Sequence, residues 1–412
     1  MNEPTGREEA GDRPPPSIND IRTPGPAARV RMLSGDVGYV VTRAAEAQHV
    51  LCDPAFSSAA TFLPRAPAQP REPVGSSRVL FEMDPPEHTR LRRAVAQAFN
   101  RRRVEAMRAG IAQVVDGLLD EMAAGGPPAD LVHALCAPLP LTDICELLGV
   151  RREDRDSFRG WAETIMALRG HSPEEIDRAR AAIQRYFVDL VAARRAEPAG
   201  DLVSELLTMS DRGERISEAE LVRLAITLLI AGHGPTMNQL ARCVYALLAR
   251  PELYAALHRD PDLVAPAVEE LLRTVPSVPV GTPRLALRDV EIGGVPIPAG
   301  STVAVSALAA NHDPALFPDP EMTDLGRTDN KHLTFGHGPH FCIGAQLARP
   351  APGGAPGGRP VARGLPLPRP PGAARDLVTV RLGRLARRRQ GARPVSLATV
   401  SSSAWTCVDS PA

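Results

Sequence analysis

The pattern of hydrophobic and polar positions predicts a chain that is mostly helical from about Asp84 onward. In the stretch EHTRLRRAVAQAFNRRRVEAMRAGIAQVVDGLLDEM, apolar and charged residues recur at helical spacing, with a break near Asn100. Five further stretches have the same amphipathic spacing: Leu139–Leu148, Glu174–Arg195, Asp201–Met209, Glu218–Arg250 and Pro261–Val275. The sequence therefore predicts a body dominated by helices.

One later segment has the alternation of β-strands. Residues 279–314, PVGTPRLALRDVEIGGVPIPAGSTVAVSALAANHDP, place apolar and polar residues in alternating runs. The GGVPIP stretch at residues 293–298 separates two such runs and predicts a hairpin. We therefore expect a mainly α protein with a small β-rich subdomain, in the α+β class.

Composition and charge exclude several functions. The 412 residues are 43% hydrophobic with a formal net charge of zero, so no charge excess points to nucleic acid or to a membrane surface. No apolar run reaches membrane-spanning length, and the N-terminal residues lack the pattern of a signal peptide. We therefore expect a cytoplasmic protein whose residues 1–25 form a disordered lead.

Cysteine usage separates one residue from the rest. The six cysteines show no paired spacing, which argues against a disulfide framework in a reducing compartment. Five of them are expected to be small buried or idle thiols. These are Cys52, Cys136, Cys145, Cys243 and Cys407.

The sixth, Cys342, lies in the sequence FGHGPHFCIG, residues 335–344. A thiolate that binds haem iron must approach the metal on a short loop, with donors directed at its sulfur. Glycines at positions 336, 338 and 344 allow tight turns and close approach to a flat ring. The following IGAQLAR is expected to start a helix, whose N-terminal dipole favours the thiolate.

This pattern resembles the cysteine-loop signature of the cytochrome P450 superfamily at every defined position. The resemblance extends from about Ser57 to Arg349 and is to the soluble bacterial type. It implies the P450 fold for residues 26–349 and a haem b cofactor (iron protoporphyrin IX). By resemblance, Cys342 is the iron ligand, and Phe335 and Gly344 contact the cofactor.

The resemblance also implies residues for the two haem propionates. In DPPEHTRLRR, His88 and Arg92 are four residues apart and hence on one helical face. Such a pair on its own is typical of a solvated basic face, but at this position the family uses it to bind propionates. Arg284 and His340 resemble the family's other propionate contacts.

A further motif is the sequence EELLR at residues 269–273. In EELLR, Glu270 and Arg273 are three residues apart, a spacing that is common for surface ion pairs. By position they resemble the family's buried Glu-x-x-Arg, and Arg327 resembles its third member. We expect these residues to stabilise the fold and to take no part in catalysis.

The stretch LLIAGHGPTMNQL departs from the family. The helix above the haem usually carries an acid and an alcohol that deliver protons. Here Gly234 takes the acid position and Pro235 the alcohol position, while Thr236 points about 100° further round the helix. Pro235 also lacks an N–H and is expected to bend the helix.

Three functions remain open on these residues. The first is an O2-using monooxygenase in which ordered water, Thr236 or a substrate hydroxyl supplies protons. The second is a peroxide-using or decarboxylating enzyme in which a substrate carboxylate is the acid. The third is a haem protein that does not catalyse oxidation.

The family resemblance further implies partners. Electrons would come from a ferredoxin and a ferredoxin reductase, and the enzyme would be a monomer. The basic stretches Arg92–Arg93 and Arg101–Arg103 are candidates for docking an acidic partner, or for a solvated face. Apolar pocket segments such as SVPVGT, residues 277–282, favour a hydrophobic small molecule or a carrier-bound substrate of bacterial specialised metabolism.

The resemblance ends where the composition changes. Residues 350–412 contain ten arginines and two aspartates, a net charge of about +8, with many prolines and glycines. Such a segment buries too little apolar surface to offset its ordering entropy, so we expect a disordered or non-native tail. We hypothesise a reading-frame change near Arg349, which would also leave the core under the haem partly uncovered.

Overall fold

The computed structural model of the chain describes residues 25–31, 37–62, 80–99, 101–126, 129–166, 170–210, 216–349 and 406–407. The expected lead at residues 1–25 lies almost wholly outside these ranges. The expected tail at residues 350–412 also lies outside them, except for Thr406 and Cys407. The division of the chain into lead, body and tail, and the hypothesis of a frame change, therefore stay predictions.

Helices dominate the described chain, as the hydrophobic pattern predicts. The α-helices are α2 (Ala44–Cys52), α3 (Glu87–Ala98), α4 (Arg101–Gly125), α5 (Pro138–Leu148), α6 (Arg155–Met166), α7 (Pro173–Ala196), α8 (Leu202–Met209), α9 (Glu218–Leu248), α10 (Pro251–Arg259), α11 (Val264–Thr274) and α12 (Ala307–Ala310). Shorter 3-10 or π turns are η1 (Ala59–Phe62), η2 (Leu80–Glu82), η3 (Val132–Cys136), η4 (Arg152–Asp154), η6 (Pro261–Leu263), η7 (Gly338–His340) and η8 (Ile343–Gln346).

Local sequence signals explain where several helices begin and end. The predicted break near Asn100 separates α3 from α4. The two longest later helices, α7 and α9, each begin with a capping box, formed by Ser172 with Glu175 and by Ser217 with Glu220. In each box the serine side chain and the glutamate side chain satisfy free backbone N–H groups of the first turn.

The strands form a small sheet and a separate hairpin. Strands β1 (Ala27–Arg31), β2 (Val37–Val41), β3 (Phe56–Ser57), β4 (Arg284–Ala286), β7 (Thr302–Val305) and β8 (Thr406–Cys407) form one sheet in the order β3-β4-β7-β2-β1-β8. Only the β2–β7 pair within this sheet is parallel, with Tyr39 opposite Val303. The predicted hairpin is confirmed as β5 (Val290–Ile292) and β6 (Val295–Ile297).

The two-residue turn of this hairpin depends on glycine. Gly293 and Gly294 have φ angles of +55° and +84°. Left-handed values at both central residues are typical of the turn that matches the twist of a two-residue hairpin. A mainly α fold with a small β-rich region is thus confirmed.

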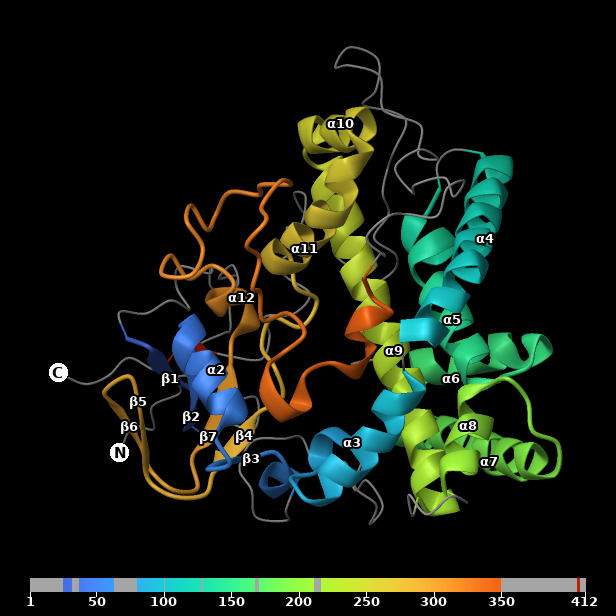
Figure 1. Ribbon diagram of the computed structural model, residues 1–412, viewed down its shortest axis with the longest axis horizontal. Coiled ribbons are helices and arrows are strands. Elements are labelled where there is room, and N and C mark those ends of the chain that lie inside the picture. Colours follow the sequence, from blue (N-terminus) through green and yellow to red (C-terminus); the bar gives the residue numbers. More distant parts are fainter. Residues whose placement is uncertain are drawn as a thin grey trace, which may run out of the picture.

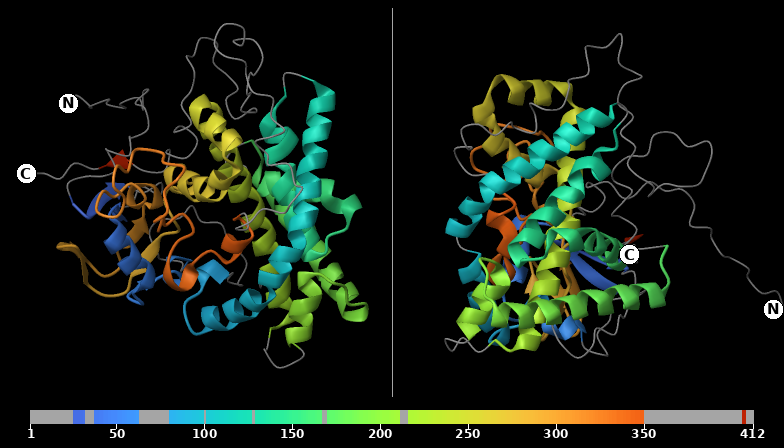
Figure 2. Two further views of the ribbon diagram at one scale, coloured as in Figure 1. Left: turned by 45° about the horizontal axis from the view of Figure 1, so that its top comes forward. Right: turned by 90° about the vertical axis from the view of Figure 1, so that its right-hand side faces the viewer.

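The elements are arranged in two regions on either side of α9. The strands, with α2 and α12, lie on one side, and α4 to α8 lie on the other (Figure 1). Figure 2 (left) shows the same separation from another direction. The segment after Cys342, η8, lies beside α9 in Figure 1, between the two regions.

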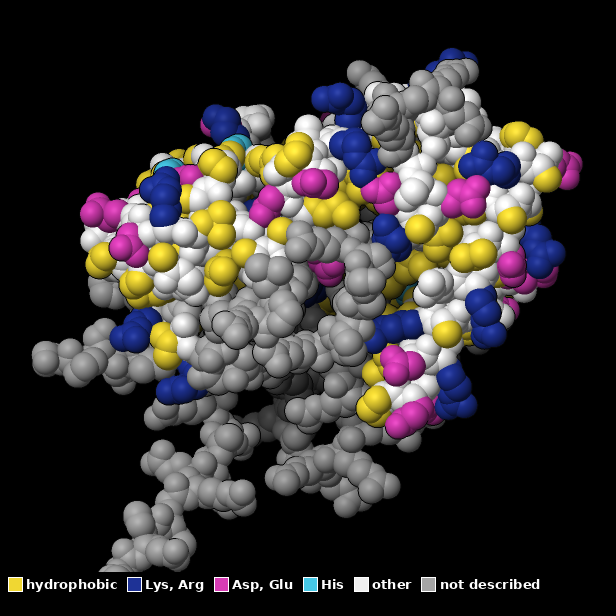
Figure 3. All heavy atoms as spheres, turned by 90° about the horizontal axis from the view of Figure 1, so that it is seen from below, with side chains coloured by type: hydrophobic (Ala, Val, Ile, Leu, Met, Phe, Trp, Pro, Cys, Tyr) yellow, Lys and Arg dark blue, Asp and Glu magenta, His cyan; other side chains and the backbone are white. Residues whose placement is uncertain are grey.

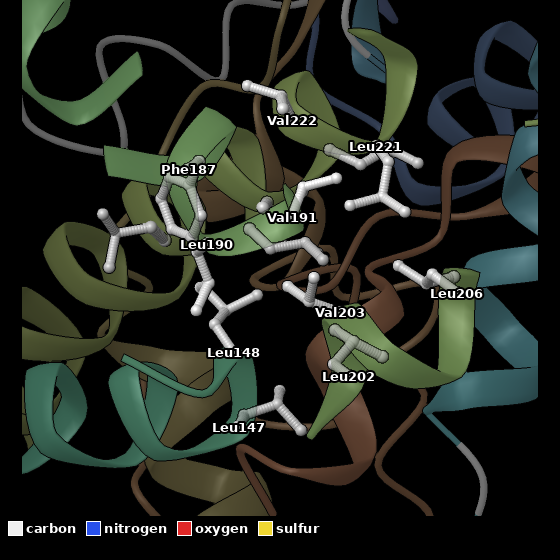
Figure 4. Close-up of a cluster of buried hydrophobic side chains, with 14 of the residues drawn as sticks. Leu147, Leu148, Phe187, Leu190, Val191, Leu202, Val203, Leu206, Leu221 and Val222 are labelled. Carbon is white, nitrogen blue, oxygen red and sulfur yellow. The ribbon is translucent and has the colours of Figure 1, made fainter. Parts of the chain in front are cut away.

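The main hydrophobic core lies within the helical region. Side chains from α5, α7, α8 and α9 point toward one another, among them Leu148, Phe187, Val203 and Leu221 (Figure 4). Ile343 and Leu347, just after Cys342, pack against this same core. The core therefore helps to fix the position of the cysteine segment.

The described surface carries charges of both signs. In the view from below, Lys and Arg side chains are interspersed with Asp and Glu and with hydrophobic side chains over the described surface (Figure 3). Among the residues that the structure describes, no helix combines the length and the apolar character needed to span a bilayer.

Candidate functional site

The loop before Cys342 has the geometry that its glycines predict. Gly336 and Gly338 adopt φ angles of +73° and +68°, which favour glycine. A Cβ atom on Gly338 would lie 2.8 Å from both the Leu51 carbonyl oxygen and the Cys52 sulfur. The Cys342 N–H donates to the Phe335 carbonyl at 2.8 Å and closes the loop. Turn geometry and close packing against α2 thus both require glycine here.

The Cys342 thiol is accessible on one side and enclosed by protein on the others. Burial raises the pKa of this thiol, while hydrogen bonds from the backbone of Gly344 and the charges of Arg92 and Arg349 lower it. A Cβ atom on Gly344 would lie 3.9 Å from the sulfur. On balance the pKa of Cys342 stays above its usual value, so the donors directed at the sulfur offset only part of the effect of burial on the thiolate that a metal ligand requires.

The sequence prediction about the segment after Cys342 was wrong in one respect. IGAQLAR does not form an α-helix; it forms the 3-10 helix η8 at Ile343–Gln346, followed by turns to Arg349. A four-residue helix has a small dipole, so local backbone N–H groups, and not a macrodipole, act on the sulfur.

The four basic residues expected at the propionates form one cluster. The His88 and His340 rings lie 4.1 Å apart between centroids, and His88 is almost fully buried. Burial lowers the pKa of His88, and Arg92 and Arg284 lower it further. Burial, followed by the charges of Arg284 and His88, lowers the pKa of His340 to about 3.

The cluster contains buried polar atoms that lack hydrogen-bond partners in the described part of the chain. Both ring nitrogens of His88 and the Nε of Arg284 are buried and have no hydrogen-bond partner among the described residues. Arg284 donates through Nη1 to the Ser58 hydroxyl at 2.8 Å, and Arg92 donates to the Phe341 carbonyl. Unpaired buried donors and like charges are unfavourable unless an anion joins them. The residues therefore fit a group with two carboxylates, such as the haem propionates.

The third expected site, Gly234 to Thr236, lies within α9. This helix runs without interruption from Glu218 to Leu248 and includes Pro235, so Pro235 does not end it. The expected bend at Pro235 stays a prediction. Gly234 is buried, whereas Pro235 and Thr236 are partly accessible. The structure thus places the substituted acid and alcohol positions in the central helix.

His233 points away from the accessible face of this helix. Its side chain is buried beside the backbone of Ala137, between η3 and α5. Both ring nitrogens have no hydrogen-bond partner within the described chain. Burial lowers the pKa of His233, the nearby backbone of Ala137 offsets part of this effect, and the charge of Arg159 lowers the pKa further. His233 thus faces a neighbouring segment.

The expected structural network is also present. Glu270 and Arg273 are completely buried and paired, and Arg327 donates to Glu270 at 3.2 Å. Sequence reasoning missed Asn330, whose amide donates to the same carboxylate at 3.0 Å. No spacing in the sequence signals Asn330, because it lies 60 positions from its partner.

Sequence reasoning missed a second group on the same helix. Glu269, the neighbour of Glu270, accepts hydrogen bonds from Arg349 and His332. The Arg349 guanidinium lies 4.5 Å from the centre of the Phe335 ring. Phe335, the first residue of the Cys342 loop and expected to contact the cofactor, therefore packs against the Arg349 guanidinium.

Known proteins resemble this chain in sequence and in fold. The family model described as Cytochrome P450 matches residues 164–351. Nocardicin C N-oxygenase of Nocardia uniformis subsp. tsuyamanensis is 44% identical over 339 residues, which are 81% of this chain and 84% of the relative. Mycinamicin IV hydroxylase/epoxidase of Micromonospora griseorubida is 44% identical over 79% of this chain and 81% of the relative.

A solved structure shows the same similarity. The LnmZ cytochrome P450 hydroxylase from the leinamycin biosynthetic pathway of Streptomyces atroolivaceus S-140 superposes with a TM-score of 0.74. It is 40% identical, and the match covers 80% of this chain and 90% of that one. Sequence and fold agree with the cysteine loop and its neighbouring cluster of basic side chains: the chain belongs to the cytochrome P450 family of haem monooxygenases.

Proposed function

We propose that this protein inserts one oxygen atom from O2 into a hydrophobic small-molecule or carrier-bound substrate in bacterial specialised metabolism. The observation that carries the proposal is the Cys342 loop, which presents an accessible sulfur near four basic side chains. Their buried donors lack acceptors within the described residues. Such a site suits a cofactor with an iron at its centre and two carboxylates at its edge.

Each residue of the site has a defined role in this proposal. Cys342 binds the iron of haem b, and the tight loop from Phe335 to Gly344 lets the backbone approach the ring. The propionates accept hydrogen bonds from the basic cluster: His88, Arg92, Arg284 and His340. Bound haem supplies the chemistry of O2 activation at its iron.

Proton delivery is the step for which this chain differs from its family. Gly234 and Pro235 have no group that carries a proton. Thr236 is partly accessible, and its hydroxyl makes no hydrogen bond to another described residue, so it can hold an ordered water. We therefore assign proton transfer to Thr236 through water, or to a substrate hydroxyl.

The same substitution favours a second candidate function. An enzyme without its own acid and alcohol can use peroxide, or can take a proton from a carboxylate of the substrate. Peroxide-driven oxidation or decarboxylation is therefore the alternative that Gly234 and Pro235 support.

Electron donors and substrates follow from the family and the surface. We propose a ferredoxin and its reductase as donors, a monomeric enzyme in the cytoplasm, and no nucleic-acid partner. Of the basic residues considered for docking, Arg103 is paired with Glu205 and Arg92 bonds to Phe341, so Arg93 and Arg102 are the better candidates. Two relatives are named for nocardicin C and mycinamicin IV, which are rational first substrates.

The experiment has two stages. A reduced, carbon-monoxide difference spectrum with a band at about 450 nm would show thiolate-ligated haem, whereas failure to take up haem would favour the non-catalytic reading. Turnover of the candidate substrates is then measured under labelled O2 with ferredoxin, reductase and NADPH. One labelled oxygen atom in the product supports the proposal. Product formed with peroxide but not with the reductase would favour the second candidate.

A further inference from the structure

The carboxylate of Glu269 connects α11 to the end of the cysteine segment. The Nε of Arg349 lies 2.9 Å from Glu269 Oε1 and 3.1 Å from Oε2. Both side chains are about a quarter exposed, at 27% each. The pair spans 80 positions of sequence and is less accessible than an ordinary surface ion pair.

His332 supports the carboxylate from the buried side. Its Nε2 lies 3.2 Å from Glu269 Oε2, and its side chain is 1% exposed. Its Nδ1 accepts a hydrogen bond from the Thr334 N–H at 3.3 Å, so Nδ1 carries no proton and Nε2 is the donor. His332 therefore fixes the direction of the Glu269 carboxylate.

These contacts keep the Glu269 carboxylate ionised. Burial by itself would raise the pKa of Glu269, but the hydrogen bonds from His332 and Arg349 and the charge of Arg349 lower it to about 2. The carboxylate is therefore ionised under all ordinary conditions. An ionised Glu269 holds the Arg349 cation in one place.

The Arg349 guanidinium lies over the ring of Phe335, the residue whose backbone carbonyl closes the cysteine loop. Arg349 Cζ is 4.5 Å from the Phe335 centroid, and the Phe335 carbonyl accepts the Cys342 N–H at 2.8 Å. The His332 ring lies 5.8 Å from the Phe335 ring, centroid to centroid. Loss of Arg349 would remove this contact from the Phe335 ring.

We propose that Glu269 and Arg349 are positioning residues for the iron ligand: the carboxylate holds the guanidinium over Phe335, and the pair fixes the loop that presents Cys342. The inference rests on the proposed function, because it assumes that Cys342 binds haem iron. It also explains why neighbouring carboxylates of α11 are both paired. Glu270 fixes the segment around Arg327, and Glu269 fixes the cysteine loop.

The test compares full-length Arg349→Gln, Glu269→Gln and Arg349→Lys proteins with the wild type. Arg195→Gln, which removes an exposed ion pair with Glu218, is the matched control. In the reduced, carbon-monoxide spectrum we expect both glutamine variants to lose band intensity at about 450 nm in favour of about 420 nm. Arg349→Lys keeps the charge but not the planar contact, so it should recover part of the loss.

Two further results distinguish positioning from a general loss of stability. The double variant Glu269→Gln/Arg349→Gln should show no larger spectral change than either single variant, because each residue acts through the other. Hydrogen exchange of the amides in residues 335–348 should be faster by at least about tenfold in the glutamine variants, the scale for lost charge-assisted hydrogen bonds. Amides of α4 should exchange at the wild-type rate.

The outcomes separate this inference from the proposed function. A wild-type band at about 450 nm with unchanged variants would overturn the positioning role and leave the function intact. A wild type without that band would overturn the proposed function. In that case the exchange measurement, which needs no haem, still decides: wild-type exchange at Cys342 in Arg349→Gln would overturn the inference.

Discussion

Arg273 donates two hydrogen bonds to Glu270, at 2.8 and 2.7 Å, and both side chains are completely buried. The remaining donors of Arg273 reach the backbone carbonyls of Asn311, Pro320 and Met322 at 2.8 to 2.9 Å. One buried pair thus holds α11 against the long segment that leads to the cysteine loop. Every polar atom of Arg273 is satisfied, which a buried charge requires.

We expect Glu270→Gln and Arg273→Gln each to lower the free energy of unfolding by about 3–5 kcal/mol, because each leaves an unpaired buried charge. Chemical unfolding followed by circular dichroism measures the change. Arg195→Gln, with an exposed partner, should have little effect. A loss in Glu270→Gln as small as that of the control would contradict the structural role of the network.

Arg284→Gln should weaken haem binding by about 10- to 100-fold, because a charge-assisted hydrogen bond to a propionate is lost. The protein without haem should lose less, since Arg284 there has one side-chain hydrogen bond, to Ser58, and its buried Nε has no partner in the described chain. Haem titration and thermal unfolding measure the two effects. Arg288, 66% exposed beside the same sheet, provides the control Arg288→Gln. Equal haem affinity in both variants would exclude Arg284 as a propionate contact.

Replacing both unusual residues of α9, in Gly234→Glu/Pro235→Thr, should increase the fraction of NADPH electrons that reaches product. The substitutions supply an acid and an alcohol at the positions from which the family delivers protons. Product and peroxide are measured against NADPH consumed. Pro235→Ala is the control, because it restores the helix N–H without adding a hydroxyl. If the control improves coupling equally, the backbone and not proton delivery limits the enzyme.

The stability of the protein should fall with pH below about 6.5 because of His233. Its pKa is lowered in the folded state by burial, so the unfolded chain binds a proton that the folded chain does not. Stability is complete above the unfolded value of 6.5 and decreases as pH falls, with a slope that approaches about 1.4 kcal/mol per pH unit.

Chemical unfolding of the wild type and of His233→Leu between about pH 5 and pH 7.5 tests this expectation. The difference between the two proteins isolates His233 from the other histidines. The wild type should lose more stability on acidification than the variant. Parallel pH profiles would show that His233 is protonated in the folded protein.

Some features of the site follow from the sequence because they depend on local chemistry. The glycines at positions 336 and 338 predict the tight loop, and both adopt left-handed φ angles. The four-residue spacing of His88 and Arg92 places both on α3, where the structure has them. The expected helix after Cys342 failed for a tertiary reason: Ile343 and Leu347 pack on the core and Arg349 bonds to Glu269, which together favour a compact turn.

The sequence by itself determined most of the long helices and the hairpin, because periodicity and turn residues act within a few positions of the chain, and its motif made Cys342 the expected sulfur ligand. Only the tertiary structure decided which side chains meet. Asn330 and Glu270 lie 60 positions apart, and Arg349 and Glu269 lie 80 apart. Such contacts form when the whole core packs and brings distant segments together, and no local spacing encodes them.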